Sequence, residues 1–253
     1  MHTLHDLVSS GKVLYLGVSN TPAWIVSKAN EYARQQGLTP FSVYQGQWSA
    51  AERDVERDIL PMCNDEGMAF IPYGVLGSGY FRTSAQRAAE KQNPAAKREG
   101  RNIALVDKPQ KAIMADTLDI IARARGTNIT SIALAWARFK QPWVFPVIGS
   151  RKIEHLKASI DALGISLTSE EMEKIENALP FDLGYPQTIL GGPRGATKPA
   201  DVWLTKRFGH FDWVSTPQVG DFLQYMFIPI SDSFSRHRSH IRSNVAFSHQ
   251  VLK

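Results

Sequence analysis

The sequence predicts an α/β fold, a partial (β/α)8 TIM barrel followed by a long aromatic segment. Four short apolar or aromatic runs predict strands, at Val13–Val18, Phe41–Tyr44, Met68–Tyr73 and Val144–Ile148. Their near-continuous apolarity indicates parallel strands that are covered on both faces, and helical patterns lie between them. Strands that alternate with helices form βαβ units, but four such units are half of the eight in a closed barrel.

The predicted helices have recognisable start and stop signals. Thr21 and Pro22 offer an N-cap and a first-turn proline for a helix that Gly37 ends. Thr168 begins the sequence Thr-Ser-Glu-Glu, which predicts a capping box for a helix that runs to Leu179. Further helices are predicted at residues 55–66, interrupted or kinked at Pro61, and at 110–125 and 152–163. Another is predicted at 130–139, with Asn128 or Thr130 as its cap.

Residues 1–216 are predicted to form one barrel-like domain, and residues 217–253 a tail. Within the domain, residues 82–108 are polar and charged and indicate an insertion after the third strand. Residues 180–216 hold six aromatic side chains without a clear period, which indicates a flap over a barrel mouth. The tail is rich in Ser, Arg and His, and no acid follows Asp232, so we expect it to be irregular or disordered.

Composition narrows the class of protein. The 253 residues are 43% hydrophobic and 21% charged, as in ordinary globular proteins, and no run is long and apolar enough to cross a membrane. The single cysteine, Cys63, excludes an internal disulfide framework and indicates a reducing compartment, so a cytoplasmic location is predicted. The net charge of +5 is spread along the chain, which argues against nucleic-acid binding. The tail histidines fit no common metal-ligand spacing.

The ends of the predicted strands carry the candidate functional residues, because parallel α/β folds place their sites at carboxyl ends of strands. The amide and hydroxyl groups of Ser19, Asn20 and Gln45 can pair with a planar carboxamide, and Tyr73 offers a ring for stacking. The loop Gly74, Val75, Leu76, Gly77, Ser78 and Gly79 lets backbone amides approach a pyrophosphate, and Gly149, Ser150, Arg151 and Lys152 begin a helix with cations that suit a phosphate.

Each of these features also has a purely structural explanation. Ser19-Asn20 is good turn and cap chemistry, and Gln45 could satisfy a buried backbone group. Gly77-Ser78-Gly79 does not match G-x-G-x-x-G, and Arg151-Lys152 is compatible with a solvated helix start. Their order, one at each strand end, favours a phosphorylated nicotinamide dinucleotide laid across a barrel mouth.

The chain resembles the aldo-keto reductases, and within them the fungal aryl-alcohol dehydrogenase and norsolorinic acid reductase-like group. The resemblance extends over roughly residues 3–216 and implies that the chain is the last four units of the barrel, with Val13–Asn20 as the fifth strand. It rests on the segments Ser10–Asn20, Val43–Ser49, Pro72–Gly79, Pro146–Lys152 and Phe181–Pro186.

The resemblance also implies roles for single residues. Ser19, Asn20 and Gln45 match the positions that hold the nicotinamide carboxamide, and Tyr73 the aromatic residue that stacks on its ring. Leu76, Gly77 and Ser78 match the pyrophosphate loop, and Ser150, Arg151 and Lys152 the adenosine-phosphate site. His155 stands where the family often has arginine, and Ala158 and Ser159 where it has a Glu-Asn pair against the adenine.

The family activity that the resemblance implies is NADPH-dependent reduction of an aryl aldehyde or ketone, a small-molecule substrate, in fungal secondary metabolism. Its catalytic Asp, Tyr, Lys and His come from the first four units, so no catalytic residue is assigned and little or no reductase activity is expected from this chain. Two alternatives stay open. One is a non-catalytic half-barrel that binds nucleotide or self-associates through exposed sheet edges, and the other is a gene-model fragment.

Overall fold

A computed structural model describes residues 1–92, 109–150, 152–191, 202 and 205–209, all within one compact unit, Met1–Ser215. The predicted tail, and Trp203, Phe211 and Trp213 of the predicted flap, lie outside the described residues. No helix among the described residues is long and apolar enough to cross a membrane. The helices are α1 (His2–Ser9), α2 (Ala23–Gln35), α3 (Ile59–Asp65), α4 (Ser84–Gln92), α5 (Pro109–Ala124), α6 (Ile129–Lys140), α7 (Ile153–Asp161), α8 (Ser169–Asn177), α9 (Gln187–Gly191) and α10 (Thr205–Phe208).

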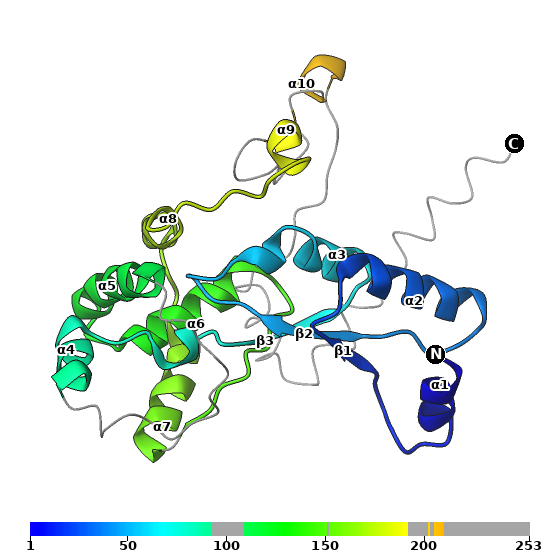
Figure 1. Ribbon diagram of the computed structural model, residues 1–253, viewed down its shortest axis with the longest axis horizontal. Coiled ribbons are helices and arrows are strands. Elements are labelled where there is room, and N and C mark those ends of the chain that lie inside the picture. Colours follow the sequence, from blue (N-terminus) through cyan, green and yellow to red (C-terminus); the bar gives the residue numbers. More distant parts are fainter. Residues whose placement is uncertain (93–108, 151, 192–201, 203–204, 210–253) are drawn as a thin grey trace, which may run out of the picture. The chain divides into compact units, whose positions relative to one another are not determined.

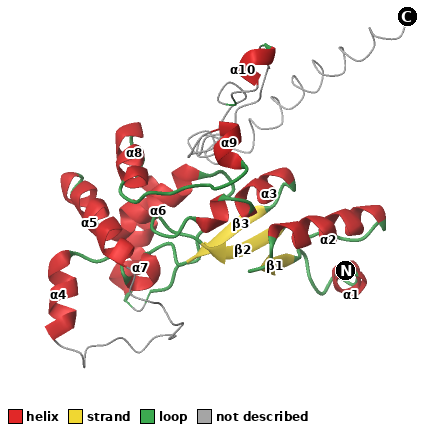
Figure 2. Ribbon diagram, turned by 45° about the horizontal axis from the view of Figure 1, so that its top comes forward, coloured by secondary structure: helices red, strands yellow, loops and turns green. Residues whose placement is uncertain are grey.

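In the described part of the chain, three parallel strands form a sheet in the order β1 (Gly17–Ser19), β2 (Val43–Gln47) and β3 (Ala69–Tyr73). They lie side by side in Figures 1 and 2, and both views place α2 and α3 on the same side of them. The register pairs Ser19 with Gln45 and Gln47 with Tyr73. The parallel α/β architecture predicted from alternating strand and helix patterns is therefore present.

One face of the sheet carries the core. Side chains alternate along β2 and β3, so that Tyr44 and Phe70 are buried while Gln45 and Ile71 are half-buried on the other face. Trp48 follows β2, and the centre of its ring lies 4.9 Å from that of Trp136 of α6. This contact joins the sheet to α6. The prediction that the strands are covered on both faces was wrong for β1, where Gly17 and Ser19 are exposed, whereas the second face of β2 and β3 is half-buried.

The first predicted strand is shorter than expected. Pairing with β2 begins at Gly17, which stands opposite Val43, the first residue of β2. Leu14 and Tyr15 precede this ladder and are exposed, with 78% and 76% of their surface accessible. The apolar run at Val13–Val18 thus overestimated the strand, because most of its residues have no ladder partner on β2. The second strand begins at Val43 rather than at Phe41.

The fourth predicted strand, Val144–Ile148, is held to β3 by a single bridge between Phe70 and Val144. The Phe70 amide donates to the Trp143 carbonyl, and the Phe145 and Val147 amides donate to the Phe70 and Pro72 carbonyls, at 2.9–3.0 Å. The next rung of a parallel ladder would need the amide of Pro72, which proline lacks. The run therefore follows β3 without forming a named strand.

Two helix starts differ from their predictions. Pro22, not Thr21, is the N-cap of α2, and the Thr21 hydroxyl donates to the Ser19 carbonyl. The helix predicted at residues 55–66 is divided into a 3-10 turn, Asp54–Glu56, and α3, so the break precedes Pro61. Pro61 lies in the first turn of α3, where its missing amide has no intrahelical partner to lose.

Other helix predictions hold. Thr168 caps α8 with a complete capping box, because its hydroxyl accepts from the Glu171 amide and the Glu171 carboxylate accepts from the Thr168 amide. The predicted insertion at 82–108 contains α4, and its residues 93–108 lie outside the described part.

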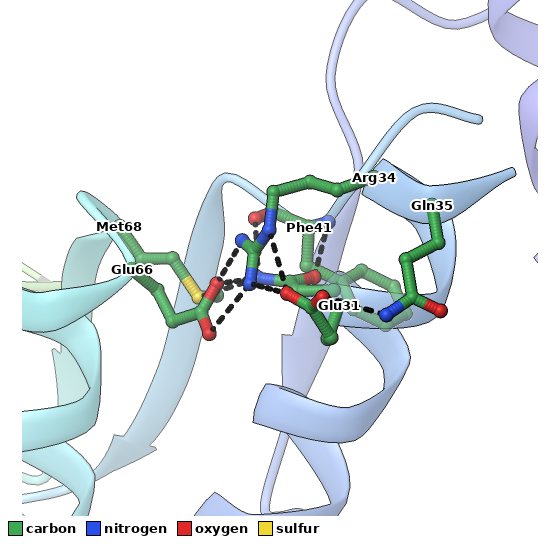
Figure 3. A network of polar contacts seen from close by, with 7 residues as sticks. Glu31, Arg34, Gln35, Phe41, Glu66 and Met68 are labelled. Atoms are coloured by element: carbon green, nitrogen blue, oxygen red, sulfur yellow. Dashed lines mark hydrogen bonds and ion pairs between the residues drawn. The ribbon is translucent and has the colours of Figure 1, made fainter. Parts of the chain in front are cut away.

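The buried side-chain amide of Asn30 joins α2 to the turns that precede β2 and β3. Asn30 of α2 is 1% exposed, and its side chain pairs with both backbone groups of Phe41, at 2.8 and 3.2 Å. Its Nδ2 also donates to Glu66, which accepts from Arg34 at 2.6 Å (Figure 3). The Arg34 guanidinium holds the pKa of Glu66 below its usual value.

Candidate dinucleotide-binding site

The carboxyl edge of the sheet brings the predicted carboxamide-binding residues together. Ser19 of β1, which is exposed, stands opposite Gln45 of β2, which is half-buried, and the Asn20 backbone amide donates to the Gln45 carbonyl at 3.1 Å. The Tyr73 hydroxyl donates to Asn20 Oδ1 at 3.0 Å, so residues from the ends of β1 and β3 meet across β2. This edge presents amide, hydroxyl and aromatic groups, as carboxamide binding and ring stacking require.

Asn20 has a backbone conformation that few side chains adopt. Its φ is +52°, in the left-handed region, where asparagine is enriched among residues other than glycine. This turn directs the chain away from β1 into α2 and leaves the Asn20 side chain toward Tyr73. The small, turn-forming side chain therefore has both a structural and a candidate binding role.

The glycine-rich loop after β3 is tightly built. Gly74, Gly77, Ser78 and Gly79 all have positive φ, between +55° and +88°. A Cβ on Gly77 would lie 2.7 Å from the Phe81 ring, so only glycine fits there. Val75 is buried in the core, which makes it a support of the loop rather than a surface that a ligand could touch.

Two backbone amides of the loop donate hydrogen bonds within the loop itself. The Gly77 amide donates to the Gly74 carbonyl at 2.8 Å, and the Gly79 amide donates to the Leu76 carbonyl at 3.2 Å. The expectation that loop amides face a pyrophosphate is thus not met by these two in this conformation. A Cβ on Gly74 would lie 3.3 Å from Ser78 Oγ, which shows how closely the loop folds on itself.

A cavity of about 590 Å³ lies between the loop, the start of α6 and α7. Of the predicted residues, it is lined by Leu76, Gly79, Gly149, Ser150, His155 and Ser159. Ala158 lines it as well, so both positions at which the family has its adenine pair face this cavity. Lys152 is the N-cap residue of α7 and does not line the cavity, and Arg151 lies outside the described residues.

Several lining residues were not anticipated from the sequence. They are Phe81, Arg82, Thr83, Gln86, Asn128, Ile129, Thr130 and Glu154. Asn128 is the N-cap residue of α6 and makes no side-chain cap bond. Residues in the first turns of α6 and α7 line the cavity, so the cavity lies at the N-terminal ends of both helices. Helix N-termini favour anions, and Arg82 adds a cation, while Glu154 adds an opposing charge. Asn128 was one of the two caps predicted for α6, but a cap signal by itself does not indicate a cavity.

The Ser159 hydroxyl is partly committed to the helix. It donates to the His155 carbonyl one turn earlier, at 2.9 Å, and the residue is 8% exposed. Ser159 can still accept a hydrogen bond from a ligand, because its oxygen has free lone-pair capacity. Hydrogen-bond donation to an adenine would require that the hydroxyl turn away from the His155 carbonyl.

The aldo/keto reductase family model matches residues 1–180. The chain belongs to the aldo/keto reductase family. It is 49% identical over 226 residues to norsolorinic acid reductase B of Dothistroma septosporum, a match that spans 86% of this chain and 56% of that protein. It is 51% identical over 222 residues to norsolorinic acid reductase B of Aspergillus parasiticus, over 85% of this chain and 57% of the relative.

A third relative carries the cofactor in its name. Aryl-alcohol dehydrogenase [NADP(+)] of Phanerodontia chrysosporium is 45% identical over 196 residues, which span 76% of this chain and 50% of that protein. Among solved structures, the thermostable aldo-keto reductase Tm1743 bound to the inhibitor epalrestat has the same fold, with a TM-score of 0.51 and 24% identity. The match spans 70% of this chain and 53% of Tm1743. The chain thus spans about half the length of the curated relatives it matches.

Proposed function

We propose that this chain is the cofactor-binding half of an NADPH-dependent reductase that converts an aryl aldehyde or ketone into an alcohol. In this proposal the described strands are the fifth to seventh of the eight in the barrel, and the protein works in the cytoplasm. The observation that carries the proposal is the meeting of Ser19, Asn20, Gln45 and Tyr73 at one sheet edge. The relatives named reductases and an NADP(+)-dependent dehydrogenase support it.

The residues of the structure fit a dinucleotide. The sheet edge offers amide, hydroxyl and aromatic groups to a nicotinamide, and the cavity beyond the loop is large enough for an adenosine phosphate. Ser19, Asn20 and Gln45 would hold the carboxamide, Tyr73 would pack on the nicotinamide ring, and Ser150, Arg151 and Lys152 would bind the adenosine phosphate. The cofactor would supply hydride, and these residues would fix the face of the ring from which hydride leaves.

Reduction of a carbonyl also needs a proton at the carbonyl oxygen. Tyr73 offers a hydroxyl at this edge, and this hydroxyl donates to Asn20 Oδ1 at 3.0 Å. We therefore propose that residues 1–253 bind NADPH by themselves and reduce carbonyls little or not at all. NADPH oxidation with an aromatic aldehyde at the rate of a relative such as the Aspergillus parasiticus reductase would contradict this part of the proposal.

The binding experiment compares NADPH titrations of the purified chain and of Tyr73→Leu. Loss of ring stacking should weaken NADPH binding by roughly tenfold, because an aromatic pair contributes about 1 kcal/mol or more. Tyr185→Leu is the matched control, since Tyr185 is 82% exposed and lies outside the site, and its dissociation constant should stay within about twofold. Wild-type protein that binds no NADPH, or equal affinities for Tyr73→Leu and wild type, would contradict the proposal.

Preference for NADPH over NADH has its own readout. If Lys152 binds the additional phosphate, Lys152→Ala should lower the ratio of NADPH to NADH affinity and leave NADH binding nearly unchanged. An unchanged ratio would remove Lys152 from the phosphate site.

A second candidate function is a self-associating half-barrel, and the two edges of the described sheet favour it. Leu14 and Tyr15 are exposed beside β1, and Phe145 and Val147 are exposed on the segment that follows β3 at the other edge. The neighbouring helix α7 exposes Ile153, Leu156 and Ile160, spaced as one helical stripe. Two copies that pair these edges head to tail would bring together eight parallel segments, the number that closes a barrel.

Light scattering coupled to gel filtration tests this second candidate. The chain should have the mass of a dimer, and Leu156→Asp should convert it to a monomer because a carboxylate would be buried in the interface. Ile120→Asp on α5 is the control, since Ile120 is exposed to a similar degree but lies on neither edge. A monodisperse wild-type monomer would refute self-association.

A further inference from the structure

A buried lysine lies close to the glycine-rich loop. Lys111 of α5 is 1% exposed, and its Nζ lies 3.1 Å from Oε2 of Glu52, whose side chain is 12% exposed. Lysine is rarely buried so completely without a partner, because removing its charge from water is costly. Buried ion pairs often contribute little to the free energy of unfolding. The Lys111–Glu52 pair is therefore better explained by a role in positioning its neighbours than by a gain in stability.

The Lys111–Glu52 pair reaches both ends of the loop. Gln47, at the end of β2, donates from Nε2 to Oε2 of Glu52 at 2.9 Å, and its Cγ lies 3.7 Å from where a Cβ on Gly74 would stand. At the other end, Lys111 Nζ lies 5.2 Å from the centre of the Tyr80 ring, within cation–π range. Gly74 begins the loop and Tyr80 follows it, so the cluster of Gln47, Glu52 and Lys111 lies beside both ends of the loop.

The loop needs such external support. Ser78 has a φ of +55°, and this left-handed conformation is unfavourable for residues with a side chain. Such conformations persist when the surrounding structure holds them, and they concentrate at ligand-binding sites. The cluster of Gln47, Glu52 and Lys111 joins β2 and α5 to the loop ends and is suited to this task.

We propose that Lys111 and Glu52 are positioning residues that hold the loop at residues 74–79 in the shape that receives the pyrophosphate of the dinucleotide. This inference rests on the proposed function, because it names a support for the same site. It adds two residues, neither of which lies at a strand end or in a glycine-rich motif. They act through the loop and through Gln47, and neither lines the adenosine cavity.

The test uses two ligands that differ at the loop. NADP+ contains the pyrophosphate, whereas adenosine 2′,5′-bisphosphate lacks it and needs the adenosine cavity alone. Lys111→Met should weaken NADP+ binding by about tenfold or more, comparable to loss of a hydrogen bond to a charged group, and should leave binding of the bisphosphate within about twofold. A merely structural role would weaken both ligands alike.

Two further variants separate positioning from misfolding. Lys111→Met removes the ammonium group that lies 3.1 Å from Glu52 and keeps the Glu52 charge, whereas the double variant Lys111→Met/Glu52→Gln removes both charges and should recover much of the thermal stability. Its NADP+ affinity should stay low. Lys140→Met, which breaks the ion pair between Lys140 of α6 and Glu176 of α8, is the control that should lose stability without changing either affinity.

The outcomes are distinct. Unchanged NADP+ affinity in Lys111→Met, equal losses for both ligands, or recovery of NADP+ affinity in the double variant would overturn the positioning role while the proposed function stands. Wild-type protein that binds neither ligand would contradict the proposed function and the positioning role together. Selective loss of NADP+ affinity that persists in the double variant is the result we expect.

Discussion

Gly77→Ala tests how rigidly the loop after β3 is held. Gly77 has a φ of +62°, and an added Cβ would lie 2.7–2.9 Å from three atoms of the Phe81 ring. Phe81 is 3% exposed and belongs to the core, so its ring has little room to turn away. The methyl group therefore brings two penalties, a left-handed backbone and a collision with a packed ring.

The magnitude follows from adding these penalties. A left-handed residue other than glycine costs about 1–2 kcal/mol, and overpacking of a filled core costs about 1–3 kcal/mol. Gly77→Ala should therefore lower the free energy of unfolding by roughly 2–5 kcal/mol. Gly126→Ala is a matched control, because Gly126 has nearly the same φ, +63°, and a Cβ there would meet no atom within 4 Å.

Urea unfolding of the two variants measures the difference. Gly126→Ala should lose only the backbone contribution, about 1–2 kcal/mol, so the gap between the variants reports the collision with Phe81. Gly77→Ala should also bind NADP+ more weakly, because the loop must shift to admit the methyl group. Equal losses of stability in the two variants would show that Phe81 yields freely, and the reasoning about a rigid loop would fail.

Three further results are expected. Asn30→Ala should destabilise the protein by about 2–3 kcal/mol, because the Phe41 backbone groups lose a buried partner, and a loss below about 0.5 kcal/mol in urea unfolding would contradict this. Thr168→Ala should cost about 1 kcal/mol by loss of the helix cap, whereas Thr168→Ser should be nearly neutral; equal effects would exclude capping. Because Arg34 lowers the folded-state pKa of Glu66, this pair contributes fully above the unfolded-state value near 4.5 and loses its contribution as pH falls through the folded-state pKa. The urea midpoint should therefore fall as the pH drops below about 5, and less steeply in Arg34→Met; identical slopes would rule out the pair as a cause.

Sequence patterns predicted the site at the sheet edge because parallel strands align their carboxyl ends. Ser19 and Gln45 belong to different predicted units, yet the strand-end rule placed them together and the register makes them neighbours. The same rule led to Gly149 and Ser150, which line the cavity. What it required was only the order of strands and the residue at each end.

The remaining parts depend on packing between distant elements. Arg82 and Gln86 reach the cavity because the chain after the loop packs near α6 and α7, and no local pattern indicates this. In the sequence, Lys111 is an ordinary cation of a predicted helix. Its pairing with Glu52, which lies far earlier in the chain, is evident only from the structure. Strand limits were misjudged at Val13–Val18 because Leu14 and Tyr15 are exposed and have no ladder partner on β2, so their apolarity indicated neither burial nor strand pairing.

Because Pro72 has no amide hydrogen, β3 is only weakly paired with residues 144–148, and this weak pairing lies within the proposed site. The residues proposed to hold the nicotinamide lie on β1, β2 and β3, whereas Gly149 and Ser150 of the adenosine cavity follow the segment that a single bridge joins to β3. Sheet regions with few rungs open first in local unfolding. A dinucleotide bound at both ends would contact the strands and the residues that follow the weakly paired segment, and would hold the two together. Ligand binding should therefore slow hydrogen exchange at the Phe145 and Val147 amides, which donate to β3.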